Sequence, residues 1–171
     1  MAHSRTRLLL AAAAFAGGIL AGGIVDRVLV GGPAWEALGA DAWVQFSRDA
    51  DLGTGLIAYP LEGIGATLLV MAAALSNYLD GKTREVANAP LYLAVAFSLT
   101  GLALTLKAAP IMLELGAREA AADGQRAFDA FFFWGLYLRG AADCLAFLCE
   151  IWALSTLGHA GALAVTKGAP S

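Results

Sequence analysis

Four long apolar runs make up most of this sequence, and they lie at residues 8–30, 52–79, 89–115 and 128–157. A helix needs about 20 predominantly apolar residues to cross the hydrocarbon core of a bilayer, and each run is long enough. Backbone polar groups in lipid must be satisfied within the segment, so such runs fold as α-helices. Composition agrees, because hydrophobic residues make up 59% of the chain and charged residues 15%. The sequence therefore predicts an all-α integral membrane protein, a four-helix bundle that forms a single domain over residues 1–171.

A secretory signal peptide is the alternative interpretation of the first run. Arg5 and Arg7 precede its Ala-rich core, which is the charge pattern of such a peptide. The apolar stretch is long for a signal peptide, however, and Gly18 and Gly22 form a small-xxx-small face that suits packing between membrane helices. We therefore interpret residues 8–30 as a span.

The short connections between the spans differ in their basic residues, which usually gather on the cytoplasmic side of a membrane. One side would hold Arg5, Arg7, Lys82, Arg84 and Lys167, and the other Arg48, Arg118 and Arg126. This bias predicts a multi-pass protein of the cell membrane with both termini in the cytoplasm. The net charge of −3 and the lack of a basic stripe give no reason to expect a nucleic acid as partner.

The connection after the first span is long and amphipathic. Its apolar residues recur at near-helical spacing with acidic residues between them, and Pro33 can occupy a first helical turn. The apolar positions are Trp35, Leu38, Trp43 and Phe46. We predict a short helix over residues 33–50 that lies in the outer interface and is anchored by its tryptophans.

Four charged residues lie well inside the predicted spans: Glu62, Lys107, Arg139 and Asp143. A charge at such a depth costs about 2.5–3.5 kcal/mol on insertion scales, so it usually faces a bundle interior, a partner or a water-filled cavity. By helical rise, Glu62 lies about 15 Å from the outer end of its span, Lys107 about 12 Å and Arg139 about 17 Å. The four formal charges cancel, as a buried network requires. We predict that they meet in a polar pocket in the outer half of the membrane.

Residues that can hydrogen-bond or stack accompany these charges. Tyr59 shares a helix face with Glu62, and Thr100 shares one with Lys107. Trp134 lies on the same span as Arg139, nearer the outer surface. The predicted catalytic residues are Glu62, Arg139, Asp143 and Lys107, and the predicted substrate-binding residues are Tyr59, Trp134, Thr100 and Trp43.

A purely structural role is the alternative for the same charges. Arg139 and Asp143 are spaced i,i+4 and can pair, and Glu62 could pair with Lys107. Apolar residues would pack a small bundle equally well, so the retention of four ions favours a functional use.

Three other charged residues have simpler interpretations. Asp26 next to Arg27 is interpreted as a pair in the interface. Glu150 lies deeper than Asp143 on the same helix face, and it is interpreted as a side chain that snorkels or is partly protonated.

The histidines exclude several metal chemistries from the membrane part of the chain. His3 and His159 are the only two, and both lie outside the spans, so a His-based iron, copper, zinc or haem site there is excluded. No Walker loop, nucleophile elbow or dinucleotide fingerprint is present, and we expect no cofactor. A buried carboxylate could act as a general base toward an acidic organic substrate, with Arg139 or Lys107 stabilising the anion.

Three stretches carry a family resemblance. They are the Gly-rich first span running into Gly32-Pro33-Ala34-Trp35, the segment Trp43-Val44-Gln45-Phe46-Ser47-Arg48, and Trp134 followed by Leu138-Arg139. With the span count, this pattern resembles the DUF1772 family of four-span membrane proteins, which includes the anthrone oxygenase-like proteins. The resemblance implies a helical membrane fold and, for an enzyme, action on an aromatic polyketide without metal or flavin. Lys107 and Asp143 match no motif of that family.

Three functions are consistent with the sequence. The first is an enzyme or binding protein for a small lipophilic, aromatic or quinone-like molecule that enters from the outer leaflet. The second is a proton-coupled transporter that uses the buried carboxylates, although the chain is short and shows no clear internal repeat, so a homo-oligomer would have to supply the missing half. The third is a structural or assembly subunit of a membrane complex, with Gly18, Gly22 and Gly63 at its contacts.

Overall fold

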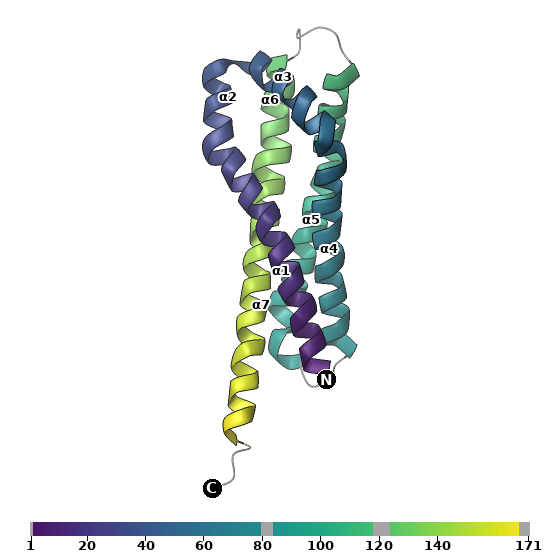
Figure 1. The fold of residues 1–171 in the computed structure, drawn as a ribbon, viewed down its shortest axis with the longest axis vertical. Helices are drawn as coiled ribbons and strands as arrows, with labels where there is room; N and C mark the ends of the chain where they lie inside the picture. The colour runs from purple at the N-terminus through teal and green to yellow at the C-terminus, as the bar shows by residue number, and fades with distance from the viewer. Residues whose placement is uncertain (1, 80–83, 118–123, 168–171) are drawn as a thin grey trace.

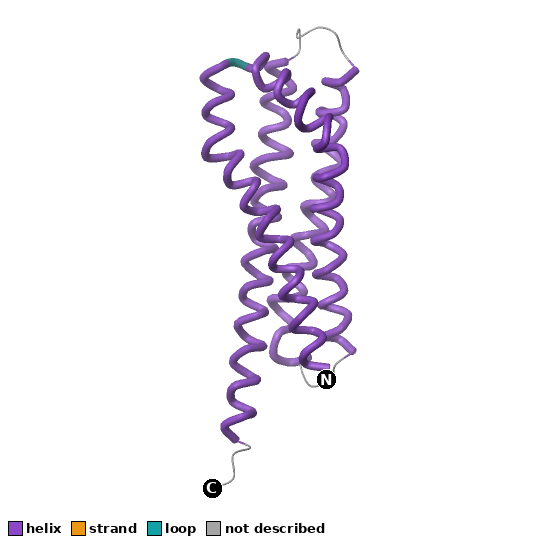
Figure 2. The backbone as a smooth tube through the Cα atoms, in the orientation of Figure 1, coloured by secondary structure: helices purple, strands orange, loops and turns teal. Residues whose placement is uncertain are grey.

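A computed structural model describes residues 2–79, 84–117 and 124–167 of the chain. Over these ranges the backbone is helical except at Gly39, and it contains no strand (Figure 2). The all-α prediction is therefore confirmed for the described part of the chain. The elements are α1 Ala2–Asp26, η1 Arg27–Gly31, α2 Gly32–Leu38, α3 Ala40–Asp49, η2 Ala50–Thr54, α4 Gly55–Leu79, α5 Arg84–Ala117, α6 Gly124–Phe131, η4 Phe132–Leu138 and α7 Arg139–Lys167, where η marks a π-helical segment.

Four helical stretches in these ranges are long and apolar enough to cross a membrane: Arg5–Leu38, Ala40–Leu79, Asn88–Leu115 and Gly124–Leu157. Each contains one of the predicted spans. Three of them are longer than predicted, because the chain runs through η1 into α2, through η2 into α4, and through η4 into α7 without leaving a helical path. Polar residues that the sequence places in connections therefore lie on helices.

The four long helical stretches pack side by side (Figure 1). α1 contacts α4 and α7, and α5 contacts the same two helices, so the main contacts form a ring. The start of α1 and the end of α7 lie at one end of the molecule, and α3 and α6 lie at the other, which we call the α3–α6 end. There Arg48 Nε donates a hydrogen bond of 2.9 Å to the carbonyl oxygen of Leu115, which joins α3 to α5.

Two apolar clusters fill the interior. In the first, Leu10, Val70 and Leu91 pack among buried alanines, whose small side chains let the helix backbones approach closely. The second lies at the α3–α6 end and is largely aromatic, with Trp43, Phe128, Phe131 and Phe132 among its members. The aromatic cluster fixes α3 and α6 on the helices that carry the candidate site.

The helix predicted over residues 33–50 is in fact two helices, α2 and α3, with a sharp turn between them. Gly39 at the turn has φ 93°, a left-handed conformation that a residue with a Cβ rarely adopts. After the turn, Trp43 points inward, where it is 1% exposed and its ring centroid lies 5.4 Å from that of Phe128. Trp43 therefore packs in the protein interior and does not anchor a helix in a membrane interface, because α6 supplies an apolar cover that local sequence spacing does not show.

Candidate functional site

One arginine at the end of the first apolar run links three elements at the α3–α6 half of the molecule. Arg27 Nη2 donates a hydrogen bond of 2.5 Å to Asp51 Oδ1, and the same nitrogen donates to the Tyr59 hydroxyl. The guanidinium also lies over the Tyr59 ring, 4.8 Å from its centroid. Asp51 is 6% exposed, so its charge-assisted hydrogen bond with Arg27 is largely shielded from water. Through its two hydrogen bonds, Arg27 joins η1 to η2 and to α4.

A second ion pair lies on α7. Arg139 Nε and Asp143 Oδ2 are 3.8 Å apart, and the Asp143 side chain is 9% exposed. The i,i+4 pairing that the sequence allowed is thus present. Arg27, Asp51 and Tyr59 lie near enough to Arg139 to interact with it electrostatically. We call Arg27, Asp51, Tyr59, Arg139 and Asp143 the polar cluster, which consists of two ion pairs that interact electrostatically without a hydrogen bond between them in the described residues.

Three charged residues of the cluster lie in or next to π-helical segments. Arg27 is the first residue of η1, Asp51 lies in η2, and Arg139 directly follows η4. A π-helical turn pairs residue i with i+5 in place of i+4, and such turns are frequent at functional sites. η2 also kinks at Gly53, whose ψ of −116° is not helical. These wide turns rotate the following residues, so regular α-helical spacing does not predict which side chains meet.

The contribution of α5 to the cluster is a glycine. A Cβ placed on Gly101 would collide with Asp143 Oδ1. The carboxyl group therefore lies directly against the α5 backbone, and a side chain at position 101 would require the carboxyl group or the helix to shift. This close approach holds Asp143 between α5 and α7, the helix pair with the most extensive packing in the described chain.

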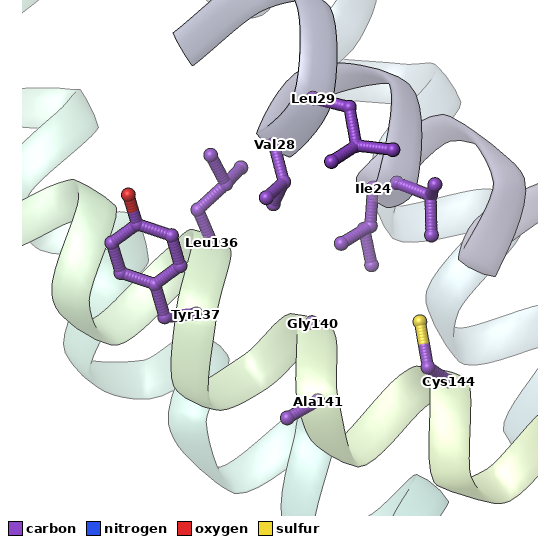
Figure 3. Close-up of a pocket in the computed structure, with 9 residues that line it drawn as sticks. Ile24, Val28, Leu29, Leu136, Tyr137, Gly140, Ala141 and Cys144 are labelled. Atoms are coloured by element: carbon purple, nitrogen blue, oxygen red, sulfur yellow. The ribbon is translucent and has the colours of Figure 1, made fainter. Parts of the chain in front are cut away.

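An apolar groove of about 280 Å³ opens between the first and last long helices (Figure 3). Its lining residues are Ile24, Val25, Val28, Leu29, Leu136, Tyr137, Gly140, Ala141 and Cys144. Arg27 and Arg139 directly precede two of these residues, Val28 and Gly140, in the sequence. Predominantly apolar walls are usual in sites for small lipophilic molecules, where a small number of polar groups fix the orientation of the ligand.

Two buried polar atoms of the cluster have no hydrogen-bond partner, Arg139 Nε and Asp51 Oδ2. The first is a donor and the second is an acceptor. Buried polar groups in proteins are nearly always paired, and leaving one unpaired costs about 1–3 kcal/mol. The cluster therefore has unused capacity to bind an oxygen at Arg139 and a hydroxyl or N–H at Asp51.

Two predicted site residues on α5 lie away from the cluster. Lys107 is exposed and, within the described ranges, forms no ion pair with Glu62. Thr100 is also exposed, and its hydroxyl donates a hydrogen bond of 2.8 Å to the carbonyl oxygen of Ala96. α5 turns Gly101 and Ala108 inward, and a neighbour in sequence lies about 100° further round a helix. The predicted meeting of Lys107 with the other charges is therefore not found.

The remaining predicted residues lie in different surroundings. Glu62 is half-buried and interacts electrostatically with Tyr59. Trp134 is 36% exposed and meets Phe133 edge to face, with the ring centroids 5.1 Å apart. Of the predicted substrate-binding residues, only Tyr59 belongs to the polar cluster, since Trp43 lies in the aromatic core.

Sequence reasoning misses two members of the cluster, Arg27 and Asp51. It pairs Arg27 with Asp26 and assigns Asp51 to a connection. In the structure Asp26 is exposed, whereas Arg27 turns the other way, toward Asp51. The available signal is that Arg27 falls inside the first apolar run, where an unpaired charge is costly.

The fold and the site define a helical protein with four candidate membrane spans, a buried polar cluster and an apolar groove between the first and last long helices. Within the residues that the structure describes, no group of three or more His, Cys, Asp or Glu could hold a metal ion. No protein-family model, curated protein or solved structure matches the chain.

Proposed function

We propose that the chain is a four-helix bundle of the cell membrane that binds a small lipophilic molecule carrying a carbonyl or hydroxyl oxygen, such as an aromatic or quinone-like compound. Both termini would be cytoplasmic, and the polar cluster would lie in the outer half of the bilayer. Four candidate spans, with the start of α1 and the end of α7 at the same end, support this arrangement. The basic residues of the predicted inner connections support its direction.

The observation that carries this proposal is the buried Arg139 Nε, which lies 3.8 Å from Asp143 Oδ2 and has no hydrogen-bond partner. The groove walls offer an apolar surface for a ring or chain, and Arg139, which precedes Gly140 of the groove in the sequence, would donate to an oxygen of the bound molecule. Asp51 Oδ2 is an unpaired acceptor in the same cluster. A ligand with both an apolar body and a polar oxygen would satisfy atoms that the protein alone leaves without partners.

The same geometry supports conversion of the bound molecule as well as binding. Asp143 can accept a proton from an acidic C–H or O–H group, and the adjacent Arg139 can stabilise the anion that results. Such an enzyme would use acid–base or oxygenase-like chemistry without a cofactor. The resemblance to the DUF1772 family points in the same direction, since its Trp-to-Arg pattern falls on Trp134 and on Arg139 of the cluster.

A structural or assembly subunit is the second candidate, and Lys107 favours it. This residue lies within a candidate span and is exposed on the molecular surface. A charge that faces lipid is energetically costly, so packing of a partner helix or a second copy of this chain against that face of α5 would be favourable.

Small molecules that co-purify with the full chain in lipid nanodiscs test the ligand proposal, with mass spectrometry as the readout. We expect a lipophilic phenol, quinone or related compound from the wild type and a marked loss of it from Arg139→Met. Ala141→Phe, which fills the groove, should displace the compound, whereas Ala103→Phe on the exposed face of α5 is a matched control that should retain it. Recovery of phospholipid alone, or equal recovery from all variants, would contradict the proposal.

A further inference from the structure

A second buried acid lies on α7, outside the polar cluster. Glu150 follows Asp143 by two helical turns on the same face, about 10 Å nearer the end that holds the termini. Its side chain is 1% exposed, and its Oε2 has no hydrogen-bond partner. The proposed function makes no use of this carboxyl group.

The first long helix makes room for this carboxyl group. A Cβ placed on Gly17 would lie 2.6 Å from Glu150 Oε2 and 3.6 Å from Oε1. Both oxygens therefore lie against the α1 backbone, at a position where a Cβ would require the carboxyl group to shift. Asp143 lies in a corresponding position at Gly101 of α5, so the two acids of one α7 face each meet a glycine on a different helix.

The helices that pack around Glu150 offer it no counter-charge. Residues 8–25 of α1, 63–77 of α4 and 93–106 of α5 contain no titratable side chain. Tyr92 and Lys107 flank the α5 segment, and Glu62 and Tyr78 flank the α4 segment. On α7 itself the nearest titratable groups are Cys149, which interacts with Glu150 electrostatically, then Cys144, and then Asp143, which is paired with Arg139.

An ionised carboxylate in this position would be buried without a cation and without a complete set of hydrogen bonds. The effective penalty for such a group is several kcal/mol, whereas the neutral acid avoids most of it. The surroundings of Glu150 therefore favour the protonated form as long as α1 stays packed against α7.

We propose that Glu150 is a proton-binding site at the contact between α1 and α7. The carboxyl group holds its proton while Gly17 covers it, and it transfers the proton to water when the two helices separate. The same helix pair forms the apolar groove further along, past the close approach of Gly18 to Phe147 and at the close approach of Gly140 to Ile24. A molecule that parts the helices in the groove would thus favour proton release, and a low pH would disfavour its binding to the same extent.

Labelling with N,N′-dicyclohexylcarbodiimide tests the proton site directly, using the full chain in lipid vesicles without any added ligand. This apolar reagent takes the carboxyl proton on one nitrogen while the carboxylate oxygen adds to its central carbon, and the product rearranges to a stable N-acylurea. We expect peptide mass spectrometry to place the adduct on Glu150 at neutral pH. Glu150→Gln should abolish that adduct, and Asp143→Asn should leave it unchanged.

Two glycine variants of α1 distinguish an effect of the contact between α1 and α7 from a general effect of substitution. Gly17→Ala pushes the carboxyl group away from α1 and should reduce labelling of Glu150 several-fold, because water then reaches the carboxylate. Gly22→Ala, on the same helix with no atom within 4 Å of its Cβ, is the matched control and should label like the wild type.

Absence of an adduct on Glu150 in the wild type would overturn the proton site, and equal labelling of the two glycine variants would overturn the role of the α1 contact. Neither outcome depends on the groove ligand, so failure of the proposed function remains distinguishable. Circular dichroism and gel filtration of each variant establish that the fold is intact.

Discussion

Arg27 and Asp51 form an ion pair of 2.5 Å that joins the first long helix to the segment leading into α4. The side chains of the pair are 21% and 5% exposed, so the pair is largely shielded from water. Arg27 also donates to the Tyr59 hydroxyl and stacks on its ring, which fixes the position of the phenol in the polar cluster. The pair thereby connects η1, which follows the first long helix, to η2, which leads into α4.

Replacing Arg27 with methionine should destabilise the protein strongly. Asp51 would be left as a buried, unpaired carboxylate, and removal of one partner from such a pair costs about 3–5 kcal/mol. Arg27→Met combined with Asp51→Leu removes both charges and should restore most of the loss. Unfolding in detergent micelles by the two single variants and the double variant measures the coupling, and strictly additive losses would show that the pair is not coupled.

Lys107 should be dispensable for the polar cluster, in contrast to Arg139. Lys107→Met removes an exposed cation that contacts no member of the cluster, so it should leave ligand recovery unchanged. Arg139→Met removes the buried Nε donor that has no hydrogen-bond partner, and it should reduce recovery several-fold. Quantitative mass spectrometry of the nanodisc extracts compares the two, and a loss with Lys107→Met alone would place the site on α5.

Gly101→Ala should destabilise the contact between α5 and α7. The added methyl group would collide with Asp143 Oδ1, and overpacking of this kind costs about 1–3 kcal/mol. Gly65→Ala is the matched control, because its Cβ meets nothing within 4 Å and alanine in a helix is favoured over glycine by about 0.5–1 kcal/mol. We expect the midpoint of thermal unfolding to fall for Gly101→Ala and to rise for Gly65→Ala. A Gly101→Ala variant as stable as the control would contradict the close approach of Asp143 to Gly101.

Trp43→Ala should cost about 3–5 kcal/mol of folding free energy, the usual loss for a large aromatic removed from a core. Trp43 is 1% exposed and packs on Phe128 and Phe131, with ring centroids 5.4 and 5.5 Å apart. Trp152→Ala removes a ring that is 51% exposed and should cost much less. Tryptophan fluorescence can follow unfolding of both variants, and similar losses would argue that Trp43 lies in an interface.

The sequence alone determines the features that depend on local chain chemistry. The length and apolarity of the runs predict four long helices, because a chain in lipid must satisfy its backbone groups within each segment. The i,i+4 spacing of Arg139 and Asp143 likewise brings them together on any α-helix.

Tertiary structure decides which helix faces turn inward, and this depends on rotations that the π-helical segments and the contacts between distant helices set. Those rotations pair Arg27 with Asp51 and leave Asp26 exposed. They bury Trp43 under α6, and they place Gly101 at Asp143 with Lys107 on the surface. Residue spacing along one helix contains no information about such rotations, so the four predicted charges could be recognised as unusual but not assigned to one site.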